Sequence, residues 1–566
     1  MTRLTNDPAD FPAEALKGFI AANKRYVKPV YGGVARSTFT PAGKVAVVYG
    51  GGSGHYPAFA GWVGHGFADG AVCGNIFSSP SAAQAYSVLK AVHRGAGVLM
   101  GFGNYAGDVL HFGQAIERLR AEGIEADTLV VTDDIASGDA AEPEKRRGIA
   151  GDFPVFKITS AAAEAGLGFD EVRRVFARAN AATRSFGVAF AGCTLPGAKG
   201  PLFTVPAGRM GIGLGIHGEP GVAEADLGSA DDVARTLVEG LLEDRPAGAG
   251  DRVVAIVNGL GSSKYEELFV VTSCVVALLE AAGLECADVE AGEFVTSLDM
   301  AGVSLTLVWV DDELLGYWDA PCDAPAYRKG SVGSVERDDA ALSQAAAPVE
   351  VTTPGSTASR EAAEVAAGLL DDVAEMLARA QEELGALDSV AGDGDHGIGM
   401  ANGSRAAAGA AHAAVSAGGG LRTTLTAAGD AWSNRAGGTS GALWGALLTA
   451  LGSALGDEKT PGSDDLAVAL QAALSAVQRL GGAEVGDKTL VDALSPFVAA
   501  FVATDGDLAA KSATAVVAAE AGTESTRALV ARLGRARPLG EKSVGTPDPG
   551  AVSLTKVVAL LNSRLS

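Results

Sequence analysis

The densest group of chemically capable side chains in the sequence is a run of carboxylates, Asp388, Asp393 and Asp395, followed directly by His396. Carboxylates this close repel one another unless a cation neutralises them, and hard cations with oxygen ligands, Mg²⁺ above all, suit such a group. An EF-hand is excluded because no glutamate completes a twelve-residue loop; a solvated acidic loop is the simpler alternative. Downstream, GGTSG at 437–441 opens an apolar helix, which is typical of phosphate binding at a helix N-terminus. Together these features predict a nucleotide-phosphate site with magnesium.

A second group of polar residues follows predicted strands in the first half of the chain. The segment GGGSGH at 50–55 comes directly after the strand expected at Lys44–Tyr49. A glycine-rich turn there would present backbone N–H groups at the carboxyl end of a sheet, where α/β proteins bind ligands. It is not a P-loop, because no Gly-Lys-Ser/Thr follows; the alternative is a tight turn with a surface histidine. Asp108, in GNYAGD after the strand expected at Gly97–Gly101, could act as a general base or be a turn residue.

The segment GLGIHG at 213–218 matches the dinucleotide pattern G-x-G-x-x-G. Pro220 and Gly221 follow at once and would break the helix that must receive a pyrophosphate. A NAD-dependent oxidoreductase is therefore a weakened alternative. We expect instead that close-packed glycines hold His217 with its ring toward a cleft, unless it is a structural histidine.

Two regions with different patterns of apolar and polar residues must position these side chains. In residues 1–328, apolar runs alternate with amphipathic stretches, which predicts an α/β domain with mainly parallel strands. The expected strands are Val45–Tyr49, Gly97–Gly101, Leu129–Thr132, Val188–Phe190, Val253–Val257 and Leu305–Val310, and the expected helices include Phe112–Glu122 and Phe169–Asn180. Residues 329–358 are polar and indicate a linker. Residues 359–566 predict an all-α domain with helices at Val468–Leu480, at Ser525–Leu533 and along Val365, Leu369, Val373, Met376, Ala380 and Leu384.

Composition narrows the function classes. The 566 residues include 44 Lys+Arg and 68 Asp+Glu, a formal net charge of −24, which disfavours nucleic-acid and anionic-membrane partners. Five cysteines without C-x-x-C spacing predict neither a disulfide framework nor a zinc site. The first residues lack an apolar secretory segment, and the longest uncharged stretch, Ala436–Gly456, is too rich in Gly, Ser and Thr for a membrane span. We expect a cytoplasmic protein.

The same motifs also carry a family resemblance. GGGSGH, GNYAGD and GLGIHGEPG resemble the substrate domain of dihydroxyacetone kinases. LDSVAGDGDHG, GGTSG, GDKTLVDAL, GRARP and DPGA resemble the nucleotide domain of those enzymes. The match covers nearly the whole chain in the same order. Both domains on one chain resemble the ATP-dependent form. The resemblance implies a two-part α/β substrate domain, an antiparallel eight-helix barrel and a homodimer.

For the substrate domain, the resemblance implies phosphorylation of a terminal hydroxyl of a short ketose. His217 would bond covalently to the ketone carbon as a hemiaminal, Asp108 would be the general base, and His55 would hydrogen-bond the substrate. The further pocket residues would be Gly52, Ser53, Gly54 and Gly103.

For the helical domain, the resemblance implies that two Mg²⁺ ions are held against the ATP phosphates by Asp388, Asp393 and Asp395. It implies nucleotide contacts by His396, Gly397, Ile398, Gly399, Thr439, Ser440, Gly486, Arg535, Asp548, Pro549 and Gly550.

The chain departs from the family pattern at Gly103, where a lysine is common, and at Tyr56, which replaces a glutamate. Loss of the lysine should enlarge the pocket, so we expect erythrulose, the D enantiomer first, beside dihydroxyacetone as substrate. Two alternatives stay open: a cyclising FAD-AMP lyase side activity, and a regulatory protein that binds ketose or nucleotide without turnover.

Overall fold

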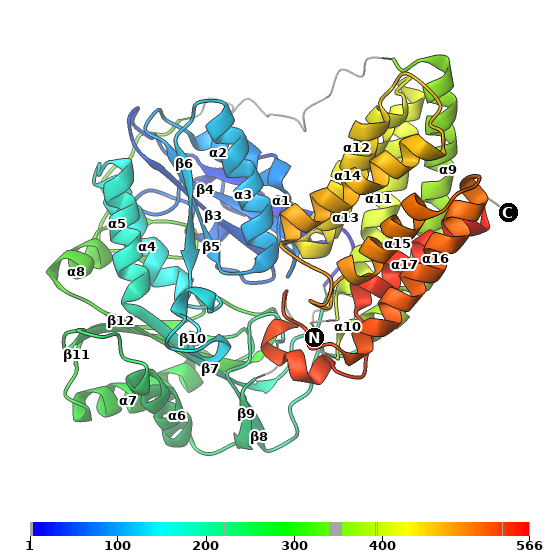
Figure 1. Ribbon diagram of the computed structural model, residues 1–566. Coiled ribbons are helices and arrows are strands. Elements are labelled where there is room, and N and C mark those ends of the chain that lie inside the picture. The colour runs from blue at the N-terminus through cyan, green and yellow to red at the C-terminus, as the bar shows by residue number, and fades with distance from the viewer. Residues whose placement is uncertain are drawn as a thin grey trace. The chain divides into compact units, whose positions relative to one another are not determined.

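The computed structural model describes residues 4–219, 221–338, 354–390, 392, 394–534 and 536–564. The chain forms two compact units, Met1–Ala347 and Pro348–Ser566 (Figure 1). All five cysteines are free, as the sequence predicts. Within the described parts of the chain, no helix is long and apolar enough to cross a membrane.

The first unit contains a mixed six-stranded sheet in the order β1-β2-β4-β3-β5-β6. Pairing is parallel from β4 through β3 and β5 to β6 and antiparallel at β1 and β2. The strands are β1 (Val27–Val30), β2 (Gly33–Arg36), β3 (Ala46–Ser53), β4 (Gly70–Ile76), β5 (Val98–Gly103) and β6 (Ala126–Val131).

A second six-stranded sheet of the same unit has the order β11-β10-β12-β7-β8-β9. The prediction of mainly parallel pairing is wrong here, since only β10 and β11 are parallel. The cause is that β7, β8 and β9 follow one another without an intervening α-helix, so they pair as antiparallel neighbours. The strands are β7 (Thr183–Ala191), β8 (Arg209–Ile212), β9 (Ala223–Asp226), β10 (Arg252–Gly259), β11 (Glu285–Gly292) and β12 (Ala301–Trp309); β13 (Cys322–Asp323) and β14 (Arg328–Lys329) form a separate ribbon.

Helices cover both sheets. Apolar side chains of α2 and α3 pack on one face of the first sheet, and those of α6 and α7 pack on the second sheet. Between the two sheets lies α4, which is buried along almost its whole length and packs on both of them (Figure 1). The helices are α1 (Phe11–Ala22), α2 (Ala82–Val92), α3 (Ala106–Ala121), α4 (Asp152–Glu164), α5 (Phe169–Ala181), α6 (Ala230–Glu243), α7 (Tyr265–Ala281) and α8 (Asp312–Asp319).

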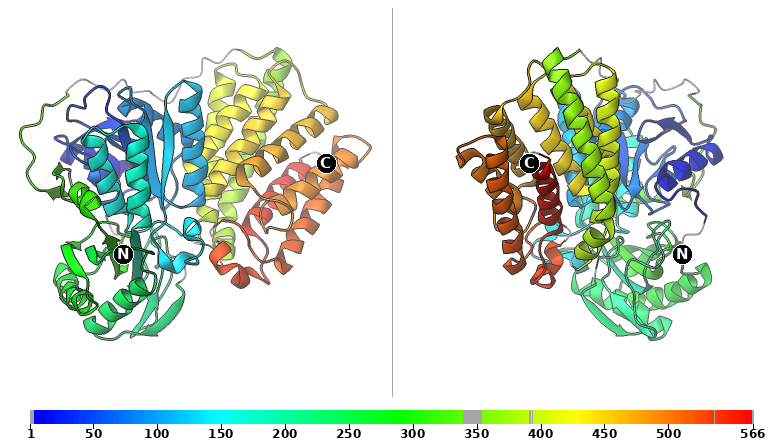
Figure 2. Two further views of the ribbon diagram at one scale, coloured as in Figure 1. Left: turned by 60° about the vertical axis from the view of Figure 1, so that its left-hand side comes forward. Right: turned by 90° about the vertical axis from the view of Figure 1, so that its right-hand side faces the viewer.

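The second unit is all-helical, as predicted. Successive helices run alongside one another and α17 returns to pack on α9, which closes the ring (Figure 2). Nine α-helices occur among the described residues because the first helical stretch is interrupted at Ala380. They are α9 (Thr357–Arg379), α10 (Gln381–Asp388), α11 (His396–Ser416), α12 (Leu421–Ala436), α13 (Gly438–Leu455), α14 (Ser463–Gly481), α15 (Val491–Ala503), α16 (Leu508–Ser525) and α17 (Pro549–Ser563).

The helix expected at Ser525–Leu533 is wrong. The last turn of α16 ends at Ser525, and a short 3₁₀ turn at Thr526–Ala528 follows. The carbonyl oxygen of Leu529 then accepts a hydrogen bond from the ammonium group of Lys488 instead of a helical N–H. A tertiary contact thus overrides the apolar spacing of the segment.

Candidate functional site

A pair of buried histidines joins the two sheets of the first unit. The Nε2 atoms of His55 and His217 lie 3.1 Å apart, and the ring planes are nearly perpendicular. Nδ1 of His55 is 2.8 Å from the carbonyl oxygen of Thr296, and Nδ1 of His217 is 3.2 Å from Oε1 of Glu219. The histidines come from sequence positions far apart: His55 follows β3, and His217 lies between β8 and β9.

These contacts fix the ring protons of the pair. A carbonyl oxygen only accepts, so Nδ1 of His55 carries a proton, and an ionised Glu219 likewise requires a proton on Nδ1 of His217. The hydrogen bond between the two Nε2 atoms needs a third proton. Two rings with three protons share one positive charge, which the carboxylate of Glu219 neutralises. When the shared proton resides on His55, the lone pair of Nε2 of His217 accepts the hydrogen bond from His55 and becomes a nucleophile when that hydrogen bond breaks.

Glu219 is itself held in place by charge. Its Oε1 lies 3.7 Å from Nη1 of Arg147, and Oε2 accepts the backbone N–H of His217 at 2.9 Å. Arg147 also pairs with buried Asp134 at 3.0 Å. A Cβ atom at Gly215 would lie 2.1 Å from Oε2 of Glu219, so only glycine permits this approach. The glycines of GLGIHG therefore form a β-hairpin connection around Glu219 and not a strand-to-helix dinucleotide turn.

The segment GGGSGH differs from the predicted turn. Strand β3 continues through Ser53, because Gly50 and Gly51 remain paired with β4. A Cβ atom at Gly52 or Gly54 would collide with Phe77, whose ring stacks on His55 with centroids 4.9 Å apart. These glycines thus allow Phe77 to support the histidine ring. The hydroxyl of Ser53 donates to the carbonyl of Gly74 at 2.6 Å.

The start of α3 lies beside the histidine pair. Asp108 is buried in the first turn of this helix, so the alternative of a turn residue is not what the structure has. Tyr105 precedes the helix, and its ring meets His217 edge-on with centroids 4.5 Å apart. A Cβ atom at Gly103 would lie 3.0 Å from the carbonyl oxygen of Gly148 and 3.2 Å from Cε2 of Tyr105. The space next to Gly103 is therefore filled by backbone and by Tyr105, which does not favour the expected enlargement of the pocket at this position.

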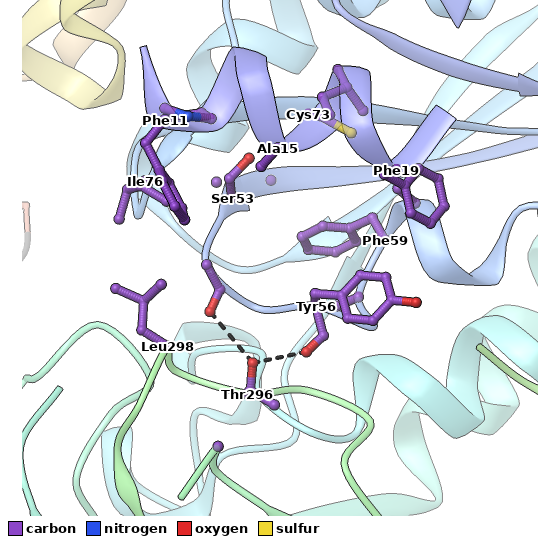
Figure 3. Close-up of a pocket in the computed structure, with 18 of the residues that line it drawn as sticks. Phe11, Ala15, Phe19, Ser53, Tyr56, Phe59, Cys73, Ile76, Thr296 and Leu298 are labelled. Carbon is purple, nitrogen blue, oxygen red and sulfur yellow. Dashed lines mark hydrogen bonds between the residues drawn. The ribbon is translucent and has the colours of Figure 1, made fainter. Parts of the chain in front are cut away.

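A cavity of about 480 Å³ borders the end of β3 on the side of α1 (Figure 3). Gly52, Ser53 and Gly54 line it, together with Thr296, whose hydroxyl donates to the carbonyl of Tyr56 at 2.8 Å. The other walls are mainly apolar side chains, among them Phe11, Ala15, Leu16, Phe19, Phe59, Ile76 and Leu298. Among the described residues, neither His55, Asp108 nor His217 belongs to this lining.

In the helical unit, three helix N-termini meet at His396. This residue begins α11; its Nδ1 lies 3.2 Å from Oγ of Ser440 in the first turn of α13, and its Nε2 lies 3.0 Å from Oγ of Ser553 in α17. Asp548 caps α17 by accepting the backbone N–H of Ala551 at 2.7 Å. Helix N-termini carry partial positive charge and free N–H groups, so this convergence suits an anion such as a phosphate chain. Gly397, Ile398 and Gly399 lie in the first turn of α11, Thr439 in that of α13, and Pro549 and Gly550 in that of α17.

Carboxylates lie around the helix N-termini that meet at His396. Burial, and then Asp492 and Asp388, raise the pKa of Asp548 to about 7, although the N–H of Ala551 opposes the shift. Asp492 accepts the N–H of Gly486 at 2.6 Å. Such an excess of buried like charge fits the oxygen-only donor set that Mg²⁺ prefers.

The predicted metal ligands are only partly within the described residues. Asp388 ends α10, and Asp395 directly precedes α11. Asp393 and the predicted nucleotide contact Arg535 lie outside the described residues. No complete three-residue group able to hold a metal occurs in the described ranges.

Three residues of these sites, Glu219, Tyr105 and Lys488, do not stand out from the sequence alone. Glu219 and Tyr105 contact His217, and Lys488 donates to the carbonyl oxygens of Leu529, Ser543 and Thr546. Each stands within a motif already noted, GLGIHGEPG, GNYAGD or GDKTLVDAL, which is the signal that could have drawn attention to them.

Comparisons with known proteins match each of the two units to a domain of one family. Residues 17–326 match the Dak1 domain and residues 390–563 match the DAK2 domain. The D-erythrulose kinase of Mycolicibacterium smegmatis is 56% identical over 562 residues, which cover 98% of this chain and 97% of that protein. The L-erythrulose 1-kinase of the same organism is 53% identical over 574 residues, covering 100% of each. The crystal structure of the dihydroxyacetone kinase from C. freundii with AMP-PNP and Mg²⁺ aligns over 100% of this chain and 99% of that chain, with 29% identity and a TM-score of 0.54.

Proposed function

The chain belongs to the dihydroxyacetone kinase family of phosphotransferases, and on that premise we propose that it transfers the terminal phosphoryl group of ATP to a terminal hydroxyl of a short ketose. We propose D-erythrulose as the preferred substrate, with L-erythrulose and dihydroxyacetone as slower ones. The single observation that carries the ketose part is the pairing of His217 with both Glu219 and His55, which prepares Nε2 of His217 as a nucleophile. The preference for the D enantiomer rests on the 56% identity with a D-erythrulose kinase.

Capture of the ketone follows from the proton count. The lone pair on Nε2 of His217 attacks the carbonyl carbon, and the carbon–oxygen π electrons move to the oxygen. The proton shared by the histidines passes from Nε2 of His55 to that oxygen, which gives a hemiaminal hydroxyl. His55 becomes neutral and the alkylated ring of His217 keeps the single positive charge, next to Glu219. An aldehyde or ketone can react in this way, whereas glycerol cannot.

The fixed ketose then presents its terminal hydroxyl for phosphorylation. Asp108, buried in the first turn of α3, is the proposed general base for that hydroxyl. In the helical unit, His396, Ser440 and the start of α17 are proposed to bind the ATP phosphates. Magnesium ions, when bound, supply the charge that offsets the phosphate oxygens during transfer.

We propose that Asp388, Asp393 and Asp395 hold two Mg²⁺ ions and that the protein is a homodimer. Calorimetric titration in the presence of AMP-PNP counts the ions, and sedimentation equilibrium gives the subunit number. One ion per chain, or a monomer at micromolar concentration, would contradict the respective statement.

The function is tested by ADP release with Mg²⁺–ATP against D-erythrulose, L-erythrulose, dihydroxyacetone, glyceraldehyde and glycerol. We expect turnover with the ketoses, the highest kcat/KM with D-erythrulose and none with glycerol. His217→Ala should abolish ketose turnover while ATP binding to the helical unit persists. A clear preference for the triose would contradict the choice of substrate. Binding of ketose and ATP without any turnover would instead favour a regulatory protein.

A further inference from the structure

The hydroxyl group of Tyr105 is buried and makes no hydrogen bond to any described residue. Other buried tyrosines of the same unit are paired. The hydroxyl of Tyr49 lies 2.7 Å from Oγ of Ser160, and that of Tyr327 donates to Glu290 at 2.7 Å. A buried hydroxyl without a partner costs free energy, so such a group in a native protein calls for an explanation.

The position of Tyr105 provides an explanation for its unpaired hydroxyl. The Tyr105 ring meets the His217 ring edge-on, at 4.5 Å between centroids and 87° between planes. Cε2 of the ring also lies beside Gly103, 3.2 Å from where a Cβ atom of that residue would be. The unpaired hydroxyl thus belongs to the side chain that packs on the proposed nucleophile, His217. The two ring nitrogens of His217 contact His55 and Glu219 and do not contact this hydroxyl.

The hydroxyl is also in the right protonation state to donate. Burial, and then the carboxylate of Glu219, raise the pKa of Tyr105 well above its ordinary value, with Arg147 opposing. A neutral phenol offers one O–H donor and suits an oxygen that gains negative charge.

We propose that Tyr105 is a substrate-binding residue whose hydroxyl donates a hydrogen bond to the oxygen derived from the ketose carbonyl when the ketose is bound to His217. This inference rests on the proposed function. The carbonyl carbon is the atom that bonds to His217, so its oxygen is only two bonds from Nε2 and is the polar ligand atom fixed close to that residue. The bond would satisfy the orphan hydroxyl only in the substrate complex, and it would hold the oxygen in place while the proton from His55 arrives.

The test is the substitution Tyr105→Phe, which removes the hydroxyl and keeps the ring. We expect the Kd for D-erythrulose, measured by calorimetry on the full chain without nucleotide, to rise about tenfold, as one lost hydrogen bond predicts. The KM for Mg²⁺–ATP should not change, and the unliganded variant should unfold at the same temperature or higher because it no longer buries an unpaired hydroxyl. The matched control is Tyr86→Phe, whose hydroxyl donates to Glu122 on the exposed surface; it should leave the ketose Kd unchanged.

A second substrate identifies the oxygen. Hydroxyacetone keeps the carbonyl of dihydroxyacetone and lacks one hydroxyl, so Tyr105→Phe should weaken both ketones by the same factor. A loss confined to dihydroxyacetone would overturn the assignment to the carbonyl oxygen. A ketose Kd within twofold of the wild-type value would overturn the proposal altogether and leave Tyr105 as a packing residue with a water partner. Wild-type binding and turnover in the same assays decide the proposed function separately, because they do not depend on the variant.

Discussion

Nδ1 of His217 lies 3.2 Å from Oε1 of Glu219, and an ionised Glu219 favours the proton on that ring nitrogen. Its carboxylate accepts from Nδ1 and leaves Nε2 for the substrate. We predict that Glu219→Gln lowers kcat/KM for D-erythrulose about 100-fold, because a hydrogen bond to a charged group contributes about 1.5–3 kcal/mol and the alkylated, cationic ring loses its counter-charge. The KM for Mg²⁺–ATP should not change. Steady-state kinetics over a range of pH measure both, with the ketose limb of the pH profile shifted in the variant.

The control for this prediction is Glu224→Gln, an exposed glutamate of the same β-hairpin. It should behave as wild type. Equal kcat/KM values for Glu219→Gln and Glu224→Gln would show that the negative charge of Glu219 is not needed for the reaction of His217.

Some residues of the histidine site can be predicted from the sequence and others cannot. His217 could be singled out because its glycine neighbours and the following Pro220 exclude a dinucleotide turn. The role of Glu219 could not, since a spacing of two residues brings side chains together only when the chain turns as it does between β8 and β9. GGGSGH predicts a ligand-binding turn, and its residues Gly52, Ser53 and Gly54 do line the cavity. The sequence does not indicate that Gly52 and Gly54 also make room for Phe77, because that contact depends on how β3 pairs with β4.

At the scale of elements, Lys488 holds the segment between α16 and α17. Its ammonium group donates to the carbonyls of Leu529, Ser543 and Thr546, at 3.1, 2.6 and 2.8 Å. We predict that Lys488→Met raises the KM for Mg²⁺–ATP at least about tenfold and leaves the ketose Kd unchanged, because three carbonyls lose a charged donor and the segment ending at the cap of α17 loosens. ATP titrations measure this, with exposed Lys542→Met as the control. An unaltered KM would mean that the segment is held in place by other contacts.

Helix α4 carries a charge between the two sheets. Lys157 is fully buried and donates to the carbonyl of Tyr317 at 3.0 Å. Burial lowers its pKa from the ordinary 10.5 to about 8, with Cys322 opposing the shift. The unfolded chain therefore binds this proton more tightly, so stability is lost as the pH falls from 10.5 towards 8 and stays at the lower level below that.

We accordingly predict that Lys157→Met stabilises the first unit near pH 7 by about 2 kcal/mol, after allowance for the lost bond to Tyr317. The gain should vanish near pH 10.5, the ordinary lysine pKa. Denaturant unfolding at both pH values measures it, and Lys90→Met, at an exposed site, is the control. A gain that does not depend on pH would come from packing and not from the buried charge.

Strand–helix alternation predicts several of the elements but not how they pair. The predicted strand Val253–Val257 lies inside β10 and the predicted helix Phe169–Asn180 matches α5. The antiparallel pairing of the second sheet depends on short connections without helices, which local periodicity does not reveal. In the helical unit the predicted Val373, Ala380 and Leu384 are buried, whereas Val365 is exposed. Small residues such as Ala363 and Ala367 also belong to the buried side of α9, which apolar size alone does not indicate.

At the scale of the whole molecule, each unit has hydrophobic cores of its own. One cluster of buried residues comes entirely from the helical unit, and the others come entirely from the α/β unit. We predict two separable calorimetric transitions. D-erythrulose should raise only the midpoint temperature of the α/β unit, and Mg²⁺–ATP should raise only the midpoint temperature of the helical unit. Each shift should be a few degrees at a ligand concentration of about 100 times Kd, where binding contributes about 2.7 kcal/mol.

Two variants assign these transitions to the proposed sites. His217→Ala should remove the shift produced by the ketose and keep the shift produced by Mg²⁺–ATP, since the two ligands are proposed to bind to separate cores. Asp388→Asn should have the opposite pattern. A single transition that responds to both ligands would mean that the units unfold as one cooperative body, which contradicts the prediction of two separable transitions.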